Sequence, residues 1–405
     1  RMYVEPANQD KCDHALTSLK QAMRWDEETY GREYDLDIFM IVAVNDFNMG
    51  AMENKGLNIF NSACVLASPE TATDADVYHI QSIIGHEYFH HWSGHRVSCR
   101  DWFQLSLKEG FTVFRDQEFS ADLNSRPVKR IADANILRTH QFAQDAGPMA
   151  HPVRPDSYIE ISNFYTVTIY NKGAEVVRML HTLLGKDRFR QGTDLYFQRY
   201  DGQAVTTDDF VSALEDANQK NLSQFKRRYS QAGTPVIEVD THYDDQANTY
   251  TLSLQQECPP TPGQSDKQPF LIPLSVALLD SKGTPFPLQL AGEDEPPGEQ
   301  RVIEFNQAQQ NFVFKNISQK PALSINRNFS APVKIKQHRS LAELTFLLAK
   351  DTDAFNRWDA GQELCIAVLL KLIDASQQNK TLEIENTVSD AFAALLADKA
   401  LDPAL

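Results

Sequence analysis

The sequence predicts a multidomain α+β protein in which a mainly helical first part is followed by a small β-sandwich and then by more helices. Three observations lead to this prediction. The chain of 405 residues is too long for one ordinary domain. Helical spacing dominates from residue 74 to about residue 230, and roughly 100 residues of short alternating strands follow. From residue 340 onward the pattern is helical again.

The first predicted elements are one helix and two strands. Residues 14–30 have helical spacing and are followed by Gly31, a residue type that often ends a helix. Residues 37–44, DIFMIVAV, form a continuous apolar run of strand length, and residues 56–67, GLNIFNSACVLA, predict a second β stretch. The segment between the two strands is therefore expected to connect them.

That connection has the sequence NMGAMENKG at residues 48–56. Gly50 and Gly56 stand near its ends, so it can form a cleft wall that a substrate backbone approaches closely. The carboxylate of Glu53 can pair there with a free α-ammonium group. The alternative is a solvated turn glutamate, because most glutamates are exposed.

The later elements are separated by changes of character near residues 233 and 338. Between these points, alternating apolar segments are punctuated by proline and glycine, which is typical of a small β-sandwich. The strand-like segments include VIEVDTHY, TYTLSLQQE, FLIPLSVALLD, RVIEFN, NFVFKNI and PVKIKQ. After them, SLAELTFLLAKDTDAFNRWDAGQELCIAVLLKLIDASQQ has helical spacing.

Composition excludes some partners and indicates a compartment. The net charge of -16 argues against nucleic acid and against an anionic membrane, since both need concentrated Lys and Arg. Five scattered cysteines without a Cys-x-x-Cys pair suit free thiols in a reducing compartment. No apolar signal region is present at the start, and the longest apolar stretch, at 365–373, is too short to span a membrane. We expect a cytoplasmic protein, and we interpret the chain, which opens at Arg1, as a piece of a longer one.

Residues 85–111, GHEYFHHWSGHRVSCRDWFQLSLKEGF, concentrate groups that bind metals. His86 and His90 are four residues apart, so on a helix both imidazoles can face one ion. This is the His-Glu-x-x-His zinc pattern, in which the glutamate, here Glu87, lies beside the metal-bound water.

Three other histidines suit the same ion less well. On a helix, His79 would lie roughly 10 Å away along the axis, and His91 would be rotated by about 140° from His86. His95 lies beyond Gly94, past the expected end of the helix. We expect these three side chains to be packed or solvated.

A catalytic zinc needs a third protein ligand and one open position. Glu109 stands 19 residues after His90, at the start of a second predicted helix. Asp116 and Glu118 compete with it on the same stretch, and spacing alone does not choose among the three.

Together these motifs resemble those of the gluzincin aminopeptidases. The resemblance rests on His86-Glu87-x-x-His90 followed by Glu109 in LKEGF, and on GAMEN at residues 50–54. The segments WDEETYGREYDLDIFMIVAVNDFNMGAMENKGLNIFNS and NFYTVTIYNKGAEVVRMLHTLLG are similar to the bacterial aminopeptidase N (alanyl aminopeptidase) branch. The resemblance to this family covers essentially the whole chain. It implies a thermolysin-like catalytic domain at 1–233, a β-sandwich at 234–337, and the truncated beginning of a C-terminal α-helical domain at 338–405.

The resemblance also implies the chemistry. One Zn²⁺ per chain would be held by His86, His90 and Glu109 and would acidify the attacking water. Glu87 would act as general base and then general acid. The resemblance assigns oxyanion stabilisation to Tyr170, which residue-level reasoning could not select among 13 tyrosines.

Substrate binding is assigned by the same resemblance to five consecutive residues. Glu53 is expected to anchor the substrate amine, and Gly50 and Ala51 to make main-chain contacts, with Met52 and Asn54 in the same wall. The expected activity is hydrolysis of the N-terminal residue from peptides that have a free N-terminus, with broad specificity for alanine, basic or large apolar residues. A monomer is expected.

Two departures from the family pattern stand out. Tyr170 is followed by Asn171, where relatives often carry an acidic residue, and the resemblance implies an N-terminal β domain, closing the cleft in the family, that we expect to lie outside this sequence. Three other functions are weighed against the aminopeptidase: a gluzincin epoxide hydrolase, a thermolysin-type endopeptidase and a non-catalytic binding protein. The endopeptidase would lack the GAMEN-type wall, and the binding protein would be expected to have lost a ligand or Glu87.

Overall fold

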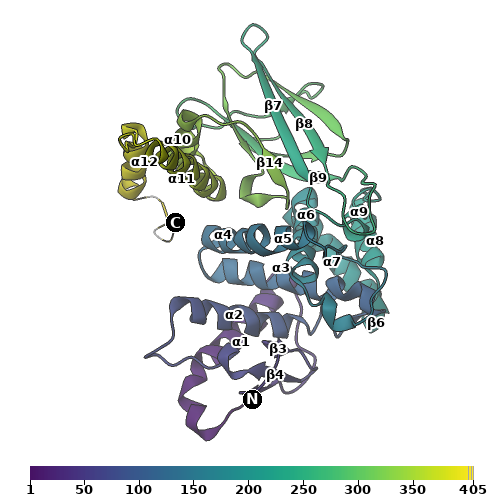
Figure 1. Ribbon diagram of the computed structural model, residues 1–405. Coiled ribbons are helices and arrows are strands. Elements are labelled where there is room, and N and C mark those ends of the chain that lie inside the picture. The colour runs from purple at the N-terminus through teal and green to yellow at the C-terminus, as the bar shows by residue number, and fades with distance from the viewer. Residues whose placement is uncertain (400, 403, 405) are drawn as a thin grey trace. The chain divides into compact units, whose positions relative to one another are not determined.

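The computed structural model describes residues 1–399, 401, 402 and 404. The chain divides into two compact units (Figure 1). The first consists of Arg1–Lys129 and Ile136–Ala232, and the second of Arg130–Asn135 and Gly233–Leu405. Among the described residues, no helix combines the length and the apolar character that crossing a membrane requires.

The first unit opens with a four-stranded sheet in the order β1-β2-β4-β3. β1 (Met2–Tyr3), β2 (Met40–Val44) and β4 (Leu57–Asn61) are parallel, and β3 (Ala51–Met52) pairs antiparallel with β4 at the edge. The strand predicted from residue 56 to 67 is therefore shorter than expected. It ends at Asn61 because that side chain accepts a hydrogen bond from the Ala63 N–H and begins a 3-10 turn.

Two helices pack on this sheet, and aromatic side chains fill the core between them. α1 (Asp13–Tyr30) ends, as predicted, at Gly31, whose φ of 64° is left-handed. α2 (Asp74–Phe89) follows the sheet and packs against α1. The ring of Trp25 lies 5.1 Å from that of Phe89 and 5.8 Å from that of Phe119, so aromatic contacts join α1 to the helices behind it.

α3 (Leu105–Leu123) is buried along almost its whole length and contacts both α2 and α6 (Gly173–Leu184) (Figure 1). At the contact with α6 the two backbones touch. A Cβ atom at Gly110 would lie only 2.7 Å from the carbonyl carbon of Gly173. The crossing is possible because neither glycine carries a side chain.

A buried ion pair ties α3 to α1. Arg115 pairs with Asp26, and both side chains are 0% exposed. The guanidinium lies over the rings of Tyr30 and Phe89, at 5.1 and 4.9 Å from their centroids. Because the charges satisfy one another inside the core, loss of either partner would leave the other uncompensated.

Shorter elements complete the first unit around α3. The helices are α5 (Phe142–Asp145), α7 (Lys186–Tyr200), α8 (Thr207–Asn218) and α9 (Arg227–Ser230), with π-helices at Leu137–Gln141 and Thr168–Lys172. α4 (Arg126–Ile136) begins in the first unit, but its residues Arg130–Asn135 belong to the second. The 3-10 helices are Pro6–Lys11, Ser62–Cys64, Trp102–Gln104 and Ile161–Phe164, and β5 (Val97–Cys99) pairs in parallel with β6 (Gln203–Val205).

The second unit contains two β-sheets. The larger has the order β10-β12-β8-β7-β14 and the smaller has the order β11-β9-β13. The strands are β7 (Val236–Asp244), β8 (Thr249–Glu257), β9 (Ile272–Leu279), β10 (Gln289–Leu290), β11 (Arg301–Phe305), β12 (Gln309–Lys315), β13 (Ala322–Ile325) and β14 (Lys334–Lys336). β8 alternates between buried and more exposed positions, as expected for a strand of a sandwich. β9 is buried at every position.

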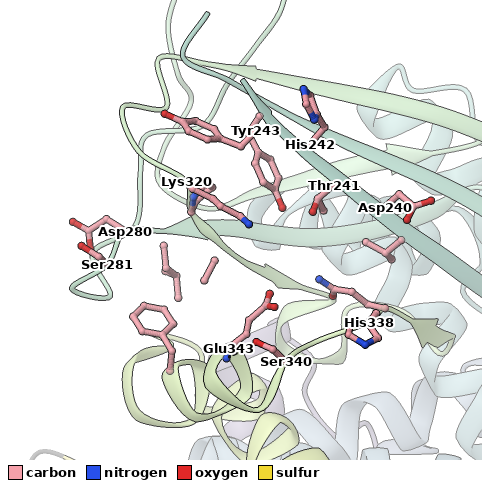
Figure 2. A pocket seen from close by; sticks show the side chains of 17 residues that line it. Asp240, Thr241, His242, Tyr243, Asp280, Ser281, Lys320, His338, Ser340 and Glu343 are labelled. Carbon is pink, nitrogen blue, oxygen red and sulfur yellow. Dashed lines mark hydrogen bonds between the residues drawn. The ribbon is translucent and has the colours of Figure 1, made fainter. Parts of the chain in front are cut away.

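A 3-10 turn at Arg327–Phe329 lies between β13 and β14, and three helices of the described residues follow the sandwich. α10 (Leu341–Lys350), α11 (Ala354–Gln377) and α12 (Asn386–Ala397) share an apolar cluster with Ala277 and Leu279 of β9. Where the sandwich meets α10, a pocket of about 730 Å³ has a polar lining of mixed charge (Figure 2). Its labelled side chains include Asp240, His242, Lys320, His338 and Glu343.

The crossing of α3 and α6 makes a prediction about stability. We expect Gly110→Ala to lower the free energy of unfolding by about 1–3 kcal/mol, because the new methyl group meets backbone atoms that cannot move aside. Urea denaturation of the full-length protein measures this. Gly298→Ala is the matched control, since its nearest atom would lie 3.7 Å away, and it should change stability by less than about 0.5 kcal/mol. Equal effects of the two substitutions would contradict the proposed close crossing.

Candidate active site

The zinc-binding pattern lies at the C-terminal end of α2. The helix begins with a capping box between Thr73 and Asp76, so its first turn is well fixed. It ends at Phe89, and His90 follows in helical conformation as the C-cap residue. The Nε2 atoms of His86 and His90 are 3.0 Å apart. The helical spacing thus brings both imidazoles to one point, as predicted.

Glu109 reaches the same point from α3. Its Oε2 atom lies 3.1 Å from His90 Nε2 and 3.3 Å from His86 Nε2. The helix was expected to begin at Glu109, but it begins at Leu105, so the carboxylate projects from the second turn. These three residues form a group whose ligand atoms all lie within 4.8 Å of one another.

The two acidic residues that compete with Glu109 in spacing have other partners. The carboxylate of Asp116 accepts a hydrogen bond from His86 Nδ1 at 2.9 Å. Glu118 pairs with Arg178 at 2.6 Å. Among the described residues, neither belongs to a group that can hold a metal ion.

The hydrogen bond at Nδ1 of each imidazole determines whether its Nε2 atom can bind a metal ion. The carbonyl oxygen of Ser93 can only accept, so His90 donates from Nδ1 across 3.0 Å. His86 donates in the same way to Asp116. Both Nε2 atoms therefore face Glu109 Oε2. Burial alone would lower the pKa of His86, but hydrogen bonds to Asp116 and Glu109 outweigh it and raise that pKa, so a metal ion bound here would displace a proton. Tetrahedral zinc, with bonds of about 2.0–2.1 Å, would hold its donors roughly 3.3 Å apart, so the residues fit this ion.

Glu87 lies beside this group and is 6% exposed. Burial raises the pKa of its carboxyl group to about 7, although His86 and His90 act in the opposite direction. Within the described part of the chain, its Oε2 atom has no hydrogen-bond partner. A buried carboxylate oxygen without a partner is costly, which is typical of a group that acts on a substrate or on water.

The GAMEN segment contributes an edge strand. Gly50 O accepts a hydrogen bond from Asn61 N at 2.9 Å, and Ala51 lies opposite Phe60 in β4. Because partners alternate along an antiparallel ladder, the main-chain groups of Ala51 point away from β4. Met52 is 40% exposed, and β3 is the outermost strand of its sheet. An extended peptide can therefore pair with this edge.

Glu53 is buried rather than solvated. Its residue exposure is 8%, which removes the exposed-turn alternative. Its Oε1 atom lies 2.6 Å from Lys108 Nζ. Burial alone would raise the pKa of Glu53, but His90 and Lys108 outweigh it and lower that pKa to about 2. Sequence reasoning missed Lys108, although its position directly before Glu109 was a visible signal.

Tyr170 comes from the π-helix Thr168–Lys172, which leads into α6. Its ring stacks beside that of His86, with centroids 6.4 Å apart and an angle of 19°. Burial raises the pKa of its hydroxyl group, so the hydroxyl keeps its proton. The crossing of Gly110 and Gly173 holds this turn against α3. Spacing along the sequence does not predict such a contact between helices. The role of Tyr170 was therefore predicted from the family resemblance alone.

Comparison with known families shows which protein family the chain belongs to. Residues 14–229 match the peptidase family M1 domain. The chain belongs to peptidase family M1. After the M1 domain, residues 233–338 match a domain of unknown function with an Ig-like fold, and residues 341–405 match a domain of unknown function described as ARM repeats. The predicted order of catalytic domain, β-sandwich and helical domain is therefore confirmed.

Similar M1 proteins are aminopeptidases by name. The chain is 54% identical to aminopeptidase N of Escherichia coli (strain K12) over 405 residues, which is 100% of this chain and 46% of that protein. It is 51% identical to aminopeptidase N of Haemophilus influenzae, over 98% of this chain and 45% of that protein. The M1 chain thus spans about half the length of the curated relatives it matches.

A solved structure supports the M1 fold. Legionella pneumophila aminopeptidase A in complex with aspartic acid matches with a TM-score of 0.85 at 32% identity. The match covers 99% of this chain and 43% of that one.

His91 and His79, two of the three remaining histidines near the M1 site, have polar partners, and the ring of the third, His95, packs 6.2 Å from that of His91. His91 lies 2.7 Å from Asp35, and burial lowers the pKa of His91 to about 4. His79 Nε2 lies 3.7 Å from the Cys64 sulfur. Burial also lowers the pKa of His95 to about 4. Among the described residues, none of the three histidines joins a group that can hold a metal ion, as expected.

Proposed function

We propose that this chain is the catalytic core of a zinc aminopeptidase that removes the N-terminal residue from peptides. The observation that carries the proposal is the convergence of three ligand atoms, from His86, His90 and Glu109, beside two buried carboxylates. The three ligand atoms suit a zinc ion. Beside them, the Glu53 carboxylate can pair with a substrate amine, and the Glu87 carboxylate can accept a proton.

His86, His90 and Glu109 would hold one zinc ion per chain. When bound, zinc acts as a Lewis acid that polarises a carbonyl group and acidifies water. Asp116 and Ser93 O fix the ring orientation of the two histidines through hydrogen bonds of 2.9 and 3.0 Å. Such outer contacts keep the imidazoles in the tautomer that a metal requires.

Glu87 is placed to move a proton. It follows His86 in α2 and does not belong to the group formed by His86, His90 and Glu109. It can accept a proton from the attacking water and deliver it to the leaving amine, so that the peptide bond breaks to give a free amine and a carboxylate. Tyr170, with its hydroxyl protonated, donates a hydrogen bond to the carbonyl oxygen as negative charge develops there.

Glu53 restricts cleavage to the end of a peptide. Its buried carboxylate pairs with the substrate's α-ammonium group, and the main chain of Gly50 and Ala51 aligns the first residue along β3. Met52 and Asn54 stand on either side of the anchor in the same wall. Because the anchor lies beside His90, only the first peptide bond reaches the proposed zinc.

The relatives support the aminopeptidase over its alternatives. Aminopeptidase N is the name of the bacterial relatives, and a related aminopeptidase A has been solved with aspartic acid, an amino acid with a free amine. An endopeptidase has no use for a buried anion at this distance from the metal group, and a binding protein has no use for the buried, unpartnered oxygen of Glu87. Broad specificity, a monomeric state and a cytoplasmic location stay predictions from the sequence.

The zinc assignment predicts a difference between two histidines of the same segment. We expect His86→Ala to lose bound zinc and His91→Ala to keep about one zinc per chain, because only His86 belongs to the converging donors. Elemental analysis of the purified full-length proteins, both checked for folding by circular dichroism, measures this. Equal zinc content in the two variants would remove the assignment.

The role of Glu87 predicts that Glu87→Gln keeps the metal and loses turnover. The amide preserves shape but cannot accept the proton, and general acid–base catalysis typically contributes a factor of about 10² to 10⁴. Hydrolysis of an aminoacyl-arylamide, normalised to zinc content, gives the value. A variant as active as the wild type would leave the proposed base without a role.

The role of Glu53 predicts a loss of discrimination for a free amine. We expect Glu53→Gln to lower kcat/KM for free-amine peptides by roughly 30- to 4000-fold, the typical cost of breaking a desolvated charge pair. Hydrolysis of N-acetylated peptides, already negligible, should not change. The exposed Glu28→Gln is the control and should match the wild type. A wild-type ratio of the two substrates in Glu53→Gln would refute the amine anchor.

A further inference from the structure

Lys108 lies between two carboxylates that have different tasks. Its Nζ atom is 2.6 Å from Glu53 Oε1 and 2.5 Å from Glu109 Oε1. The exposed fractions of the three side chains are 12%, 10% and 2% in the order Lys108, Glu53 and Glu109. One ammonium group therefore bridges the proposed amine anchor and a proposed metal ligand in a largely dry place.

The bridge divides the two oxygens of Glu109. Oε1 accepts from Lys108, and Oε2 faces the Nε2 atoms of His86 and His90. A carboxylate can bind a metal through one oxygen or through both. With Oε1 held by the ammonium group, Glu109 offers a single oxygen to the metal position.

Glu53 is a potential rival for the same ion. The ligand atoms of Glu53, Glu87 and His90 also lie within 4.8 Å of one another and form a second group that can hold a metal. His90 belongs to both groups. A divalent ion at His90 would therefore attract the Glu53 carboxylate as well as that of Glu109, unless another cation forms an ion pair with Glu53.

We infer that Lys108 is a positioning residue that keeps Glu53 off the metal and so reserves it for the substrate's ammonium group. The inference rests on the proposed function. Lys108 satisfies Glu53 through Oε1 alone, which leaves Oε2 for the substrate amine. Its own three hydrogens allow it to serve both carboxylates at once. Free-amine specificity then depends on a residue that touches neither the metal nor the scissile bond.

The test replaces Lys108 with methionine, which has a similar shape and no charge, in the full-length protein loaded with Co²⁺. Glu53 should then join the metal as a fourth protein ligand. The visible absorption spectrum of Co²⁺ should change, because a carboxylate oxygen either joins the ligands of the ion or replaces a water among them. In the zinc-loaded variant, the ratio of kcat/KM for free-amine over N-acetylated peptides should fall by about tenfold or more.

Two further variants identify the cause. Lys108→Met combined with Glu53→Gln removes the rival carboxylate and should restore the wild-type cobalt spectrum. Lys108→Arg keeps the charge and should keep that spectrum as well. Lys108→Gln replaces Lys108→Met if the latter does not give the circular dichroism of the wild type. An unchanged cobalt spectrum in the folded uncharged variant, or a changed one that persists after Glu53→Gln, would overturn the inference.

The result separates this inference from the proposed function. If Glu53→Gln alone narrows discrimination while Lys108→Met changes neither spectrum nor discrimination, the amine anchor stands and Lys108 has no positioning role. If Glu53→Gln leaves discrimination intact, the amine anchor itself fails.

Discussion

Crowding of negative charge is the constraint on which the rest of the site depends. Glu53, Glu87 and Glu109 come from separate elements, yet all three carboxylates are buried around His90. Like charges repel strongly away from water, so this arrangement needs nearby positive charge. Lys108 supplies one charge, and the proposed metal supplies two more. Lys108 therefore helps the packing of β3, α2 and α3 to hold three acids in one corner, and burial also raises the pKa of Glu87, which lowers the charge at this place.

The sequence predicted the parts of the site that lie within one helix. The pair His86 and His90 needs only helical periodicity, and Gly31 ends α1 as its chemistry suggests. The third ligand stayed open among acidic residues of α3, because spacing along one helix says nothing about its rotation relative to another. Lys108 and Tyr170 escaped residue-level reasoning for the same reason, since their roles arise from contacts between distant segments.

The small sheet shows a second limit of sequence reasoning. The GAMEN segment was expected to be only a connection, yet Ala51–Met52 forms the edge strand β3. Two residues are too few to show a period of alternation, so pairing with β4 decided their conformation. Glu53 follows this strand directly, and β3 contacts α2 while Glu53 pairs with Lys108 of α3. A strand this short depends on its pairing with a neighbouring strand, so the sequence pattern alone does not predict it.

The direction of α2 has a consequence for the choice of ion. Peptide dipoles add along a helix and give its first turn a partial positive charge and its last turn a partial negative charge, each about half an elementary charge. Asp74 and Asp76 stand in the first turn of α2, whereas His86 and His90 stand at its end. The backbone field at the histidines thus attracts cations and repels anions such as phosphate. The helix direction thus adds to the effect of the buried carboxylates and favours a cation at this end of α2.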